Sequence, residues 1–164
     1  MDKITALSQP ILPGRAIGPF KIGTSIRIYL KGLVEGVNYT KYTEEHHYPE
    51  AFIDFVQTYY SFYDGAIEVW VDENEIIGAL VCNNEYIGKL NNEFYPGYPI
   101  TAIQKNTDKF HLYDGAIKIR GFENTGFVVP MEYDYISSIN DFPRTFNLNK
   151  LFTEANNWRV LSAL

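Results

Sequence analysis

The sequence has 164 residues, which suits a single domain with a hydrophobic core of its own. Apolar residues make up 46% of the chain and charged residues 21%, a balance that is typical of a globular protein and excludes a disordered one. No apolar run approaches the roughly 20 residues that a membrane helix needs, so we expect no membrane partner. The single cysteine, Cys82, and the absence of a signal peptide at the start predict one cytoplasmic domain, residues 1–164.

Charge is unevenly distributed along the chain. The net charge is −6, but the segment from Glu44 to Glu93 holds eleven acidic residues and one cation, Lys89. Phosphate binding requires lysine or arginine to displace counterions, so this acidic segment predicts no direct binding of nucleic acid. It would instead attract a basic partner. The alternative is a solvated acidic surface without a partner.

The first part of the chain combines an arm with a turn-rich stretch. We expect residues 1–13 to form a loosely ordered arm, followed by glycine and proline turns around the short apolar piece 20–22. Thr24 or Ser25 can cap a helix. Apolar residues then recur at helical spacing, which predicts an amphipathic helix of about ten residues ending near Glu35. They are Ile26, Tyr29, Leu30 and Leu33.

From residue 37 onward the pattern changes to the two-residue period of strands. We expect strands at 37–43, 52–63, 66–71 and 76–82, with a hairpin turn at 72–75. A short helix at 97–104 and further strands at 110–119, 126–131 and 133–139 follow. Leu148, Leu151, Phe152 and Ala155 predict a C-terminal helix. The fold class expected is α+β, with a mainly antiparallel sheet of hairpins, a short N-terminal helix and a C-terminal helix.

The sequence contains a short internal repeat, which we call the echo. Residues 63–69 (YDGAIEV) resemble residues 113–119 (YDGAIKI), fifty positions later. Residues 23–26 are more loosely echoed by residues 97–100. We interpret the echo as two related helix-and-hairpin units within one domain. The alternative is chance combined with shared turn chemistry, because Asp-Gly before a strand is a common turn solution.

Catalytic and metal-binding patterns are missing from the sequence. His46 and His47 are adjacent, have no convergent partners, and are expected to be solvated turn residues. Cys82 lies in an apolar run among acidic residues, which favours a buried thiol over a nucleophile. Glu68 and Glu75 face each other across the predicted hairpin, so an acid–base hydrolase stays open as a third hypothesis. We therefore expect no enzyme activity, no cofactor and no metal.

Aromatic residues are abundant, with thirteen tyrosines, eleven phenylalanines and two tryptophans. In a strand, one member of each consecutive pair such as Tyr59-Tyr60 must face outward. Tyrosines among acidic residues suit a partner rich in arginine and lysine, through cation–π contacts and charge-assisted hydrogen bonds. The alternative is an aromatic ladder that only stabilises the sheet.

The stretch from Pro13 to Ile26 (PGRAIGPFKIGTSI) resembles the opening of immunity proteins of contact-dependent growth inhibition and related polymorphic toxin systems. Arg15-Ala16 stands where that pattern often has another glycine. The resemblance covers mainly residues 13–30. It implies a protein that binds the C-terminal toxin domain of a sister cell and blocks it, without catalytic residues of its own.

Our leading hypothesis is therefore a cytoplasmic immunity protein that neutralises a cognate basic toxin domain, with a nuclease as the expected toxin. The second hypothesis is a small non-catalytic domain that binds a peptide or ligand in an apolar groove. Under the leading hypothesis, we expect the toxin to be held by one acidic, tyrosine-rich sheet surface. Its candidate partner-binding residues are Glu44, Glu45, Tyr63, Asp64, Glu68, Trp70, Asp72, Glu73 and Glu75.

Overall fold

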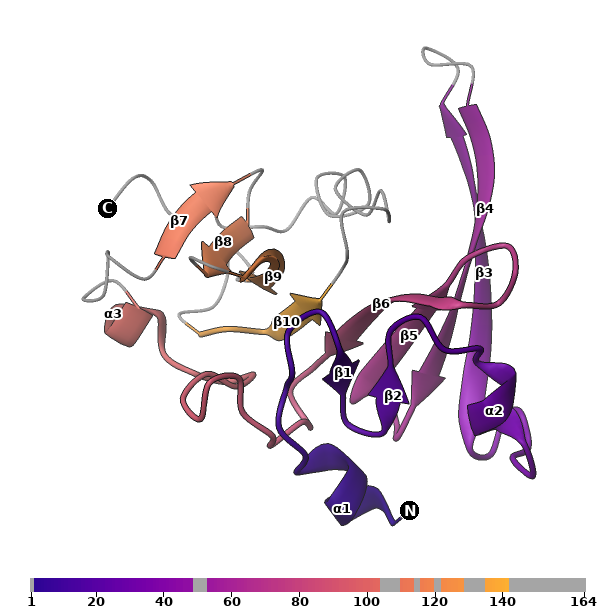
Figure 1. The fold of residues 1–164 in the computed structure, drawn as a ribbon, viewed down its shortest axis with the longest axis horizontal. Coiled ribbons are helices and arrows are strands. Elements are labelled where there is room, and N and C mark those ends of the chain that lie inside the picture. The colour runs from indigo at the N-terminus through magenta and orange to yellow at the C-terminus, as the bar shows by residue number, and fades with distance from the viewer. Residues whose placement is uncertain are drawn as a thin grey trace.

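The computed structural model describes residues 2–48, 53–103, 110–113, 116–119, 122–128 and 135–141. It confirms the expected α+β fold with a mainly antiparallel sheet (Figure 1). The elements are α1 (Lys3–Leu7), β1 (Ala16–Ile17), β2 (Phe20–Lys21), α2 (Arg27–Leu30), β3 (Tyr39–Tyr48), β4 (Ile53–Phe62), β5 (Ile67–Val71), β6 (Ile77–Cys82), α3 (Ile100–Ile103), β7 (Phe110–Tyr113), β8 (Ala116–Ile119), β9 (Phe122–Val128) and β10 (Ser138–Asp141). The predicted C-terminal helix lies outside the described residues.

The large sheet has the strand order β3-β4-β5-β6-β10-β9-β8-β7, and all its neighbouring strands are antiparallel. Among the described elements, a helix followed by four strands occurs twice, from α2 to β6 and from α3 to β10. The last strands of the two series pair at the centre, where Ile139 lies opposite Cys82. This is the arrangement expected of two helix-and-hairpin units.

The sequence echo does not follow this internal correspondence. Residues 63–69 span the turn between the second and third strands of the first series, β4 and β5. Residues 113–119 bracket the connection between the first and second strands of the second series, β7 and β8. The two copies of the echo therefore lie at positions that are not equivalent in the order of strands.

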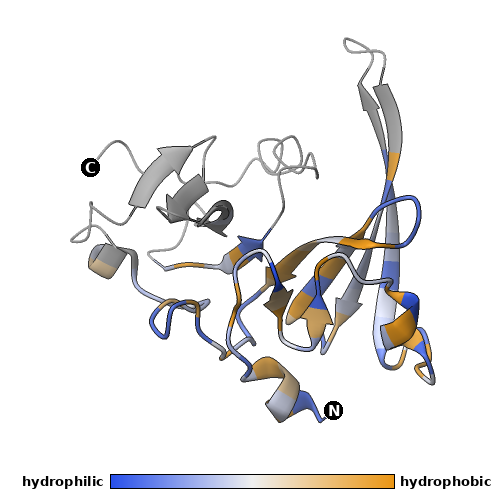
Figure 2. Cartoon of the chain, viewed as in Figure 1, coloured by the Kyte–Doolittle hydropathy of each residue, from blue (hydrophilic) through white to orange (hydrophobic). Residues whose placement is uncertain are grey.

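One face of the sheet carries the core. On β5, Ile67, Val69 and Val71 point to this face, and they pack with Leu80 and Cys82 of β6. The N-terminal part of the chain covers it with apolar side chains that include Ile11, Ile17, Phe20 and Ile26. Figure 2 shows the turn that joins β5 to β6 as a hydrophilic segment beside these hydrophobic strands. The hairpin predicted at 66–82 is thus confirmed, with its turn at residues 72–76.

The expectation of a loose N-terminal arm is wrong for the described residues 2–13. Asp2 caps α1 by accepting a hydrogen bond from the Thr5 N–H at 3.0 Å. Leu7 and Ile11 are buried in the core, and the Leu7 carbonyl accepts hydrogen bonds from the backbone of residues 87 and 88. A Cβ at Gly88 would lie 1.9 Å from the Gln9 carbonyl oxygen, so this close approach requires glycine.

The helix predicted from residue 26 to near Glu35 is also shorter than expected. α2 ends at Leu30, because Lys31 leaves helical geometry and Gly32 has a φ of +79°. Leu33, counted as the last residue of the apolar stripe, is 38% exposed. Helical spacing alone overestimated the length, because the glycine that stops the helix precedes the final apolar position.

The β3–β4 hairpin extends beyond the rest of the sheet (Figure 1). β3 and β4 pair over ten residues, from Tyr39–Phe62 to Tyr48–Ile53, whereas β4 pairs with β5 only over Thr58–Phe62. The strand predicted at 37–43 therefore starts two residues before β3 and ends five residues before the end of β3. His46 and His47 lie within β3 and not in a turn.

No helix among the described residues is long and apolar enough to cross a membrane.

Candidate functional site

Three aromatic rings form a stack on the face of the sheet opposite the core. Tyr42 of β3 lies opposite Tyr59 of β4, and Tyr59 lies opposite Trp70 of β5. The ring centroids are 4.8 Å apart for the first pair and 4.3 Å for the second, with interplanar angles of 16° and 21°. Exposure falls along the stack, from 44% for Tyr42 to 8% for Trp70. Offset stacking of this kind stabilises cross-strand pairs beyond their buried area.

Two carboxylates border this stack. Glu44 follows Tyr42 by two residues and Glu68 precedes Trp70 by two, so alternation places both on the face that carries the rings. The two charges act together on Tyr59. Burial raises the pKa of Tyr59 to about 12, and the nearby Glu68 and Glu44 carboxylates add to the rise. The ring stack therefore lies in a negative field.

Glu68 is held in a partly buried position. Asn83 Nδ2 donates a hydrogen bond to its carboxylate at 3.3 Å and another to the Gly65 carbonyl at 2.8 Å. Burial raises the pKa of Glu68, and the hydrogen bond from Asn83 opposes that rise. The indole N–H of Trp70 also lowers the pKa of Glu68, because its partial positive charge favours the ionised carboxylate. The geometry between the two groups falls short of a hydrogen bond. Repulsion from Glu44 adds to the rise.

Two buried polar atoms on this face have no hydrogen-bond partner in the described part of the chain. They are the Nε1 donor of Trp70 and the Oε1 acceptor of Gln57, whose side chains are 8% and 6% exposed. Gln57 lies directly opposite Glu44 on β4. Buried polar groups normally find partners, and each exception calls for an explanation. We name the surface formed by Tyr42, Glu44, Gln57, Tyr59, Glu68 and Trp70 the aromatic–acidic face.

The aromatic–acidic face suits recognition of a cation. A guanidinium group stacks on aromatic rings and pairs with carboxylates through several N–H donors at once. Tyr42 and Glu44 are the exposed members that a partner would meet first, and Tyr59 and Glu68 lie behind them. The two carboxylates differ in environment, since Glu68 is partly buried and Glu44 is exposed, and the six residues of the face include no histidine or arginine.

Tyr63 and Asp64 lie elsewhere, in the turn between β4 and β5. Both have positive φ, 55° and 59°, which fixes the turn ahead of Gly65. Asp64 Oδ2 forms an exposed ion pair with Lys3 Nζ at 2.7 Å, joining the turn to α1. A surface pair of this type contributes little stability, and it reduces the charge that Asp64 presents to a partner.

Asp72, Glu73 and Glu75 lie at the opposite end of β5, in the turn before β6. Asp72 Oδ1 accepts hydrogen bonds from the backbone N–H groups of residues 74 and 76, both at 2.9 Å, and so shapes the turn. Glu75 forms an ion pair with Arg27 of α2. Of the three, Glu73 is exposed and makes neither of these contacts.

The nine candidate residues therefore do not share one surface. Glu44, Glu68 and Trp70 come together, Glu45 points to the other face of β3, and the two turns are separated by the length of β5. The sequence analysis missed Tyr42, Gln57 and Tyr59. Their alternation was visible, but the register that aligns β3, β4 and β5 was not.

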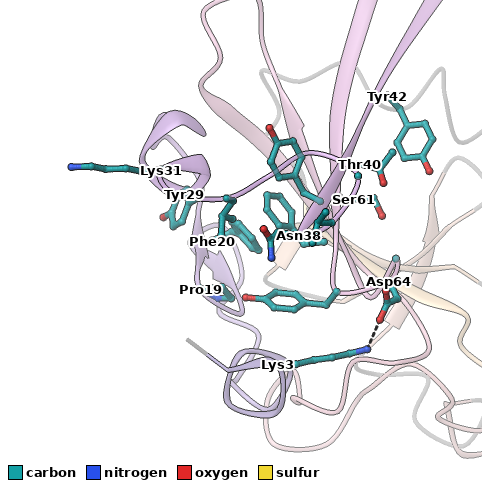
Figure 3. A pocket seen from close by; sticks show the side chains of 17 residues that line it. Lys3, Pro19, Phe20, Tyr29, Lys31, Asn38, Thr40, Tyr42, Ser61 and Asp64 are labelled. Carbon is teal, nitrogen blue, oxygen red and sulfur yellow. Dashed lines mark hydrogen bonds and ion pairs between the residues drawn. The ribbon is translucent and has the colours of Figure 1, made fainter.

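A groove of about 750 Å³ lies next to the aromatic–acidic face (Figure 3). Tyr42 lines the groove and also begins the ring stack. The view shows Tyr29 and Phe20 on one side, Thr40 and Ser61 on the other, and the Lys3–Asp64 ion pair at the base. Asp64 is its one acidic lining residue among those described, so the groove does not bring together the carboxylate pair that a glycosidase-type hydrolase requires.

Cys82 is confirmed as a buried residue, with no exposed surface, at the centre of the sheet. Burial raises the pKa of its thiol, so the thiolate form is disfavoured. No group of three or more potential metal ligands occurs in the described parts of the chain.

Comparison with known proteins gave no match to a family model, a curated protein or a solved structure.

Proposed function

We propose that this chain is an immunity protein that binds a cognate basic toxin domain and neutralises it by covering its active or substrate-binding surface. The observation that carries the proposal is the Tyr42–Tyr59–Trp70 stack between Glu44 and Glu68. Rings and carboxylates in this order are complementary to the arginine and lysine side chains with which a nuclease holds nucleic acid. The resemblance of residues 13–30 to immunity proteins is independent support.

We propose a revised set of contact residues, because the nine candidates do not share one surface. Glu44, Glu68 and Trp70 of the original set remain, and Tyr42, Gln57 and Tyr59 join them. Trp70 is largely buried, so it supports the stack and leaves direct contact to the more exposed Tyr42 and Glu44. We assign Asp64 and Glu75 a structural role in their ion pairs, and Asp72 a role in its turn.

The proposal is tested with the toxin domain expected beside this chain's reading frame. That domain is expressed in bacteria with and without the chain, and the pair is then purified together. We expect survival only with the chain, and a stable complex in stoichiometric amounts. If cells die in the presence of well-expressed chain, or if no complex forms, the proposal fails. A charge-reversed Glu44→Lys variant should protect less than a Glu73→Lys variant, which leaves the aromatic–acidic face intact.

A second candidate function is a small domain that binds a peptide or ligand, and the groove favours it. The groove is lined by rings and by Lys31, and its lining carries little negative charge. This function would place the occupied surface away from Glu44. Lys31→Glu should then abolish binding of the peptide or ligand, and Glu44→Lys should leave that binding unchanged. The first proposal expects the opposite order of effects.

A further inference from the structure

β3 is an edge strand with an open backbone edge. It stands at one end of the strand order. Within the described residues it pairs with β4 along its length and, at Tyr39 only, with Glu35 of the preceding loop, which leaves residues 40–45 without a second strand beside them. Residues 40–45 are all exposed, on both faces of the strand. An unpaired edge of this length is a template for another strand, and proteins usually blunt such edges with lysine, proline or a bulge. Here Lys41 is present, but no proline or bulge interrupts the pairing of β3 with β4.

The hydrogen bond from the Gly36 N–H to the Tyr39 carbonyl, 2.7 Å long, identifies the residues that face the open edge. Gly36 belongs to the loop before β3, so the carbonyl of Tyr39 points away from β4. In an antiparallel strand, the N–H and C=O of one residue point to the same side, and the side alternates. Lys41, Thr43 and Glu45 therefore present their backbone groups at the open edge.

We propose that two copies of this chain pair through this edge, with their β3 strands antiparallel around a two-fold axis at Thr43. In this register Thr43 lies opposite Thr43 of the second copy, and Lys41 lies opposite its Glu45. Each of the three residues whose backbone groups face the open edge then lies opposite a residue of the same kind in the second copy. Every one of these pairs is therefore of the hydrogen-bonded type. The interface is isologous, and the Lys41–Glu45 pair forms twice.

Charge selects this register over its neighbours. A two-fold axis at Lys41 would place two lysines against each other, and an axis at Glu45 would place two glutamates against each other. Like charges directly opposite are destabilising, whereas opposite charges in cross-strand pairs are favourable. The described ion pairs within the chain are Lys3–Asp64 and Arg27–Glu75, so neither Lys41 nor Glu45 is engaged in one of them.

Lys41 and Glu45 cannot pair within one chain. They lie on one face of β3 four residues apart, a separation of roughly 13 Å along an extended strand. The Lys41 ammonium lies 5.8 Å from the centroid of the Tyr60 ring, on the same face. A second copy would bring its Glu45 beside this ammonium. On the opposite face, Tyr42 of one copy would lie against Glu44 of the other, which would join the two aromatic–acidic faces.

This proposal goes beyond the immunity function and does not depend on it. The contact covers a few residues of one strand per copy, which places it among small interfaces that dissociate on dilution. We therefore expect a monomer at low micromolar concentration and a dimer at several hundred micromolar. Sedimentation velocity on the full chain over this range measures the equilibrium directly.

The test uses two single charge reversals, Lys41→Glu and Glu45→Lys. Each places like charges opposite each other twice in the homodimer, so each should weaken self-association by about tenfold or more. An equimolar mixture of the two variants restores complementary charges at both positions, and should form a heterodimer at least as stable as the wild-type dimer. Lys31→Glu, a reversal away from β3, is the matched control and should leave self-association unchanged.

A third variant, Thr43→Pro, removes the N–H at the axis from each copy. Proline is tolerated at an edge whose N–H faces solvent, so the fold should persist by circular dichroism while the dimer is lost. A wild-type chain that stays monomeric throughout the range would overturn the proposal. So would a dimer that survives Thr43→Pro, or a mixture of the two charge variants that fails to associate.

Discussion

Tyr59 of β4 stacks on Trp70 of β5 with their ring centroids 4.3 Å apart, on the face of the sheet that lies opposite the core. The sheet is therefore apolar on both faces at this point, whereas an antiparallel sheet often has one polar face. The stack ends at the exposed Tyr42 and is bordered by two carboxylates. The same few residues thus form the buried ring contacts and the proposed contact surface.

Replacing Trp70 should destabilise the fold strongly. Trp70→Ala removes a largely buried indole and the ring contact with Tyr59, and we expect a loss of about 3–5 kcal/mol in the free energy of unfolding. Trp70→Phe retains a ring and should cost less. Urea denaturation followed by circular dichroism measures both. A loss below about 1 kcal/mol for Trp70→Ala would show that the stack contributes no more than an ordinary surface contact.

Tyr86 ties the N-terminal part of the chain to the sheet. Its hydroxyl accepts a hydrogen bond from the Gly18 N–H at 2.8 Å and donates one to the Gln9 carbonyl at 2.6 Å. Tyr86→Phe leaves both backbone groups without this partner, so we expect a loss of about 1–3 kcal/mol in unfolding free energy. Tyr42→Phe removes an exposed hydroxyl and serves as the control. Equal effects of the two substitutions would contradict the role given to Tyr86.

Asp141 should make stability depend on pH. It is fully buried and accepts hydrogen bonds from the Gly14 N–H at 2.7 Å and from the Thr125 hydroxyl at 2.9 Å. Burial raises the pKa of Asp141 to about 6, against 3.8 for an unperturbed aspartate, although both hydrogen bonds lower it. The folded state therefore holds the proton more tightly than the unfolded state does.

The contribution of Asp141 to stability is accordingly full below pH 4 and is lost as pH rises through about 6. The change is on the order of 2–3 kcal/mol, because each pKa unit corresponds to about 1.4 kcal/mol. Asp141→Asn does not titrate, so its unfolding free energy should lack this fall between pH 4 and pH 7. Denaturant titrations at several pH values compare the two proteins. Parallel pH profiles would refute the assignment to Asp141.

Local patterns predicted the parts of the fold that local forces determine. The β5–β6 hairpin was visible because strand alternation flanks a turn whose Asp72 binds its own backbone. The burial of the N-terminal segment was not visible, because α1 ends at Leu7 and Ile11 lies beyond it in a single bridge to Leu90, so the two residues belong to no common regular element. Their burial depends on contacts with residues 87–90, far away in the sequence.

The candidate site shows the same limit. Glu68 and Trp70 are two residues apart in one strand, so their shared face followed from alternation alone. Tyr59 joined them only through the register of the β4–β5 pair, and Tyr42 only through the register of the β3–β4 pair, which couples residues seventeen positions apart. The negative charge of Glu75 and Asp64 was counted as available because sequence does not reveal their partners Arg27 and Lys3.

The most direct test of the account is the association rate of the chain with the proposed toxin domain for Glu44→Lys and Glu73→Lys, measured at low and high salt. Both variants change the net charge by the same amount, but only Glu44 lies on the aromatic–acidic face. We expect Glu44→Lys to slow association strongly at low salt and Glu73→Lys to remain close to wild type. Equal slowing by both variants, or a larger effect of Glu73→Lys, would contradict recognition through this face.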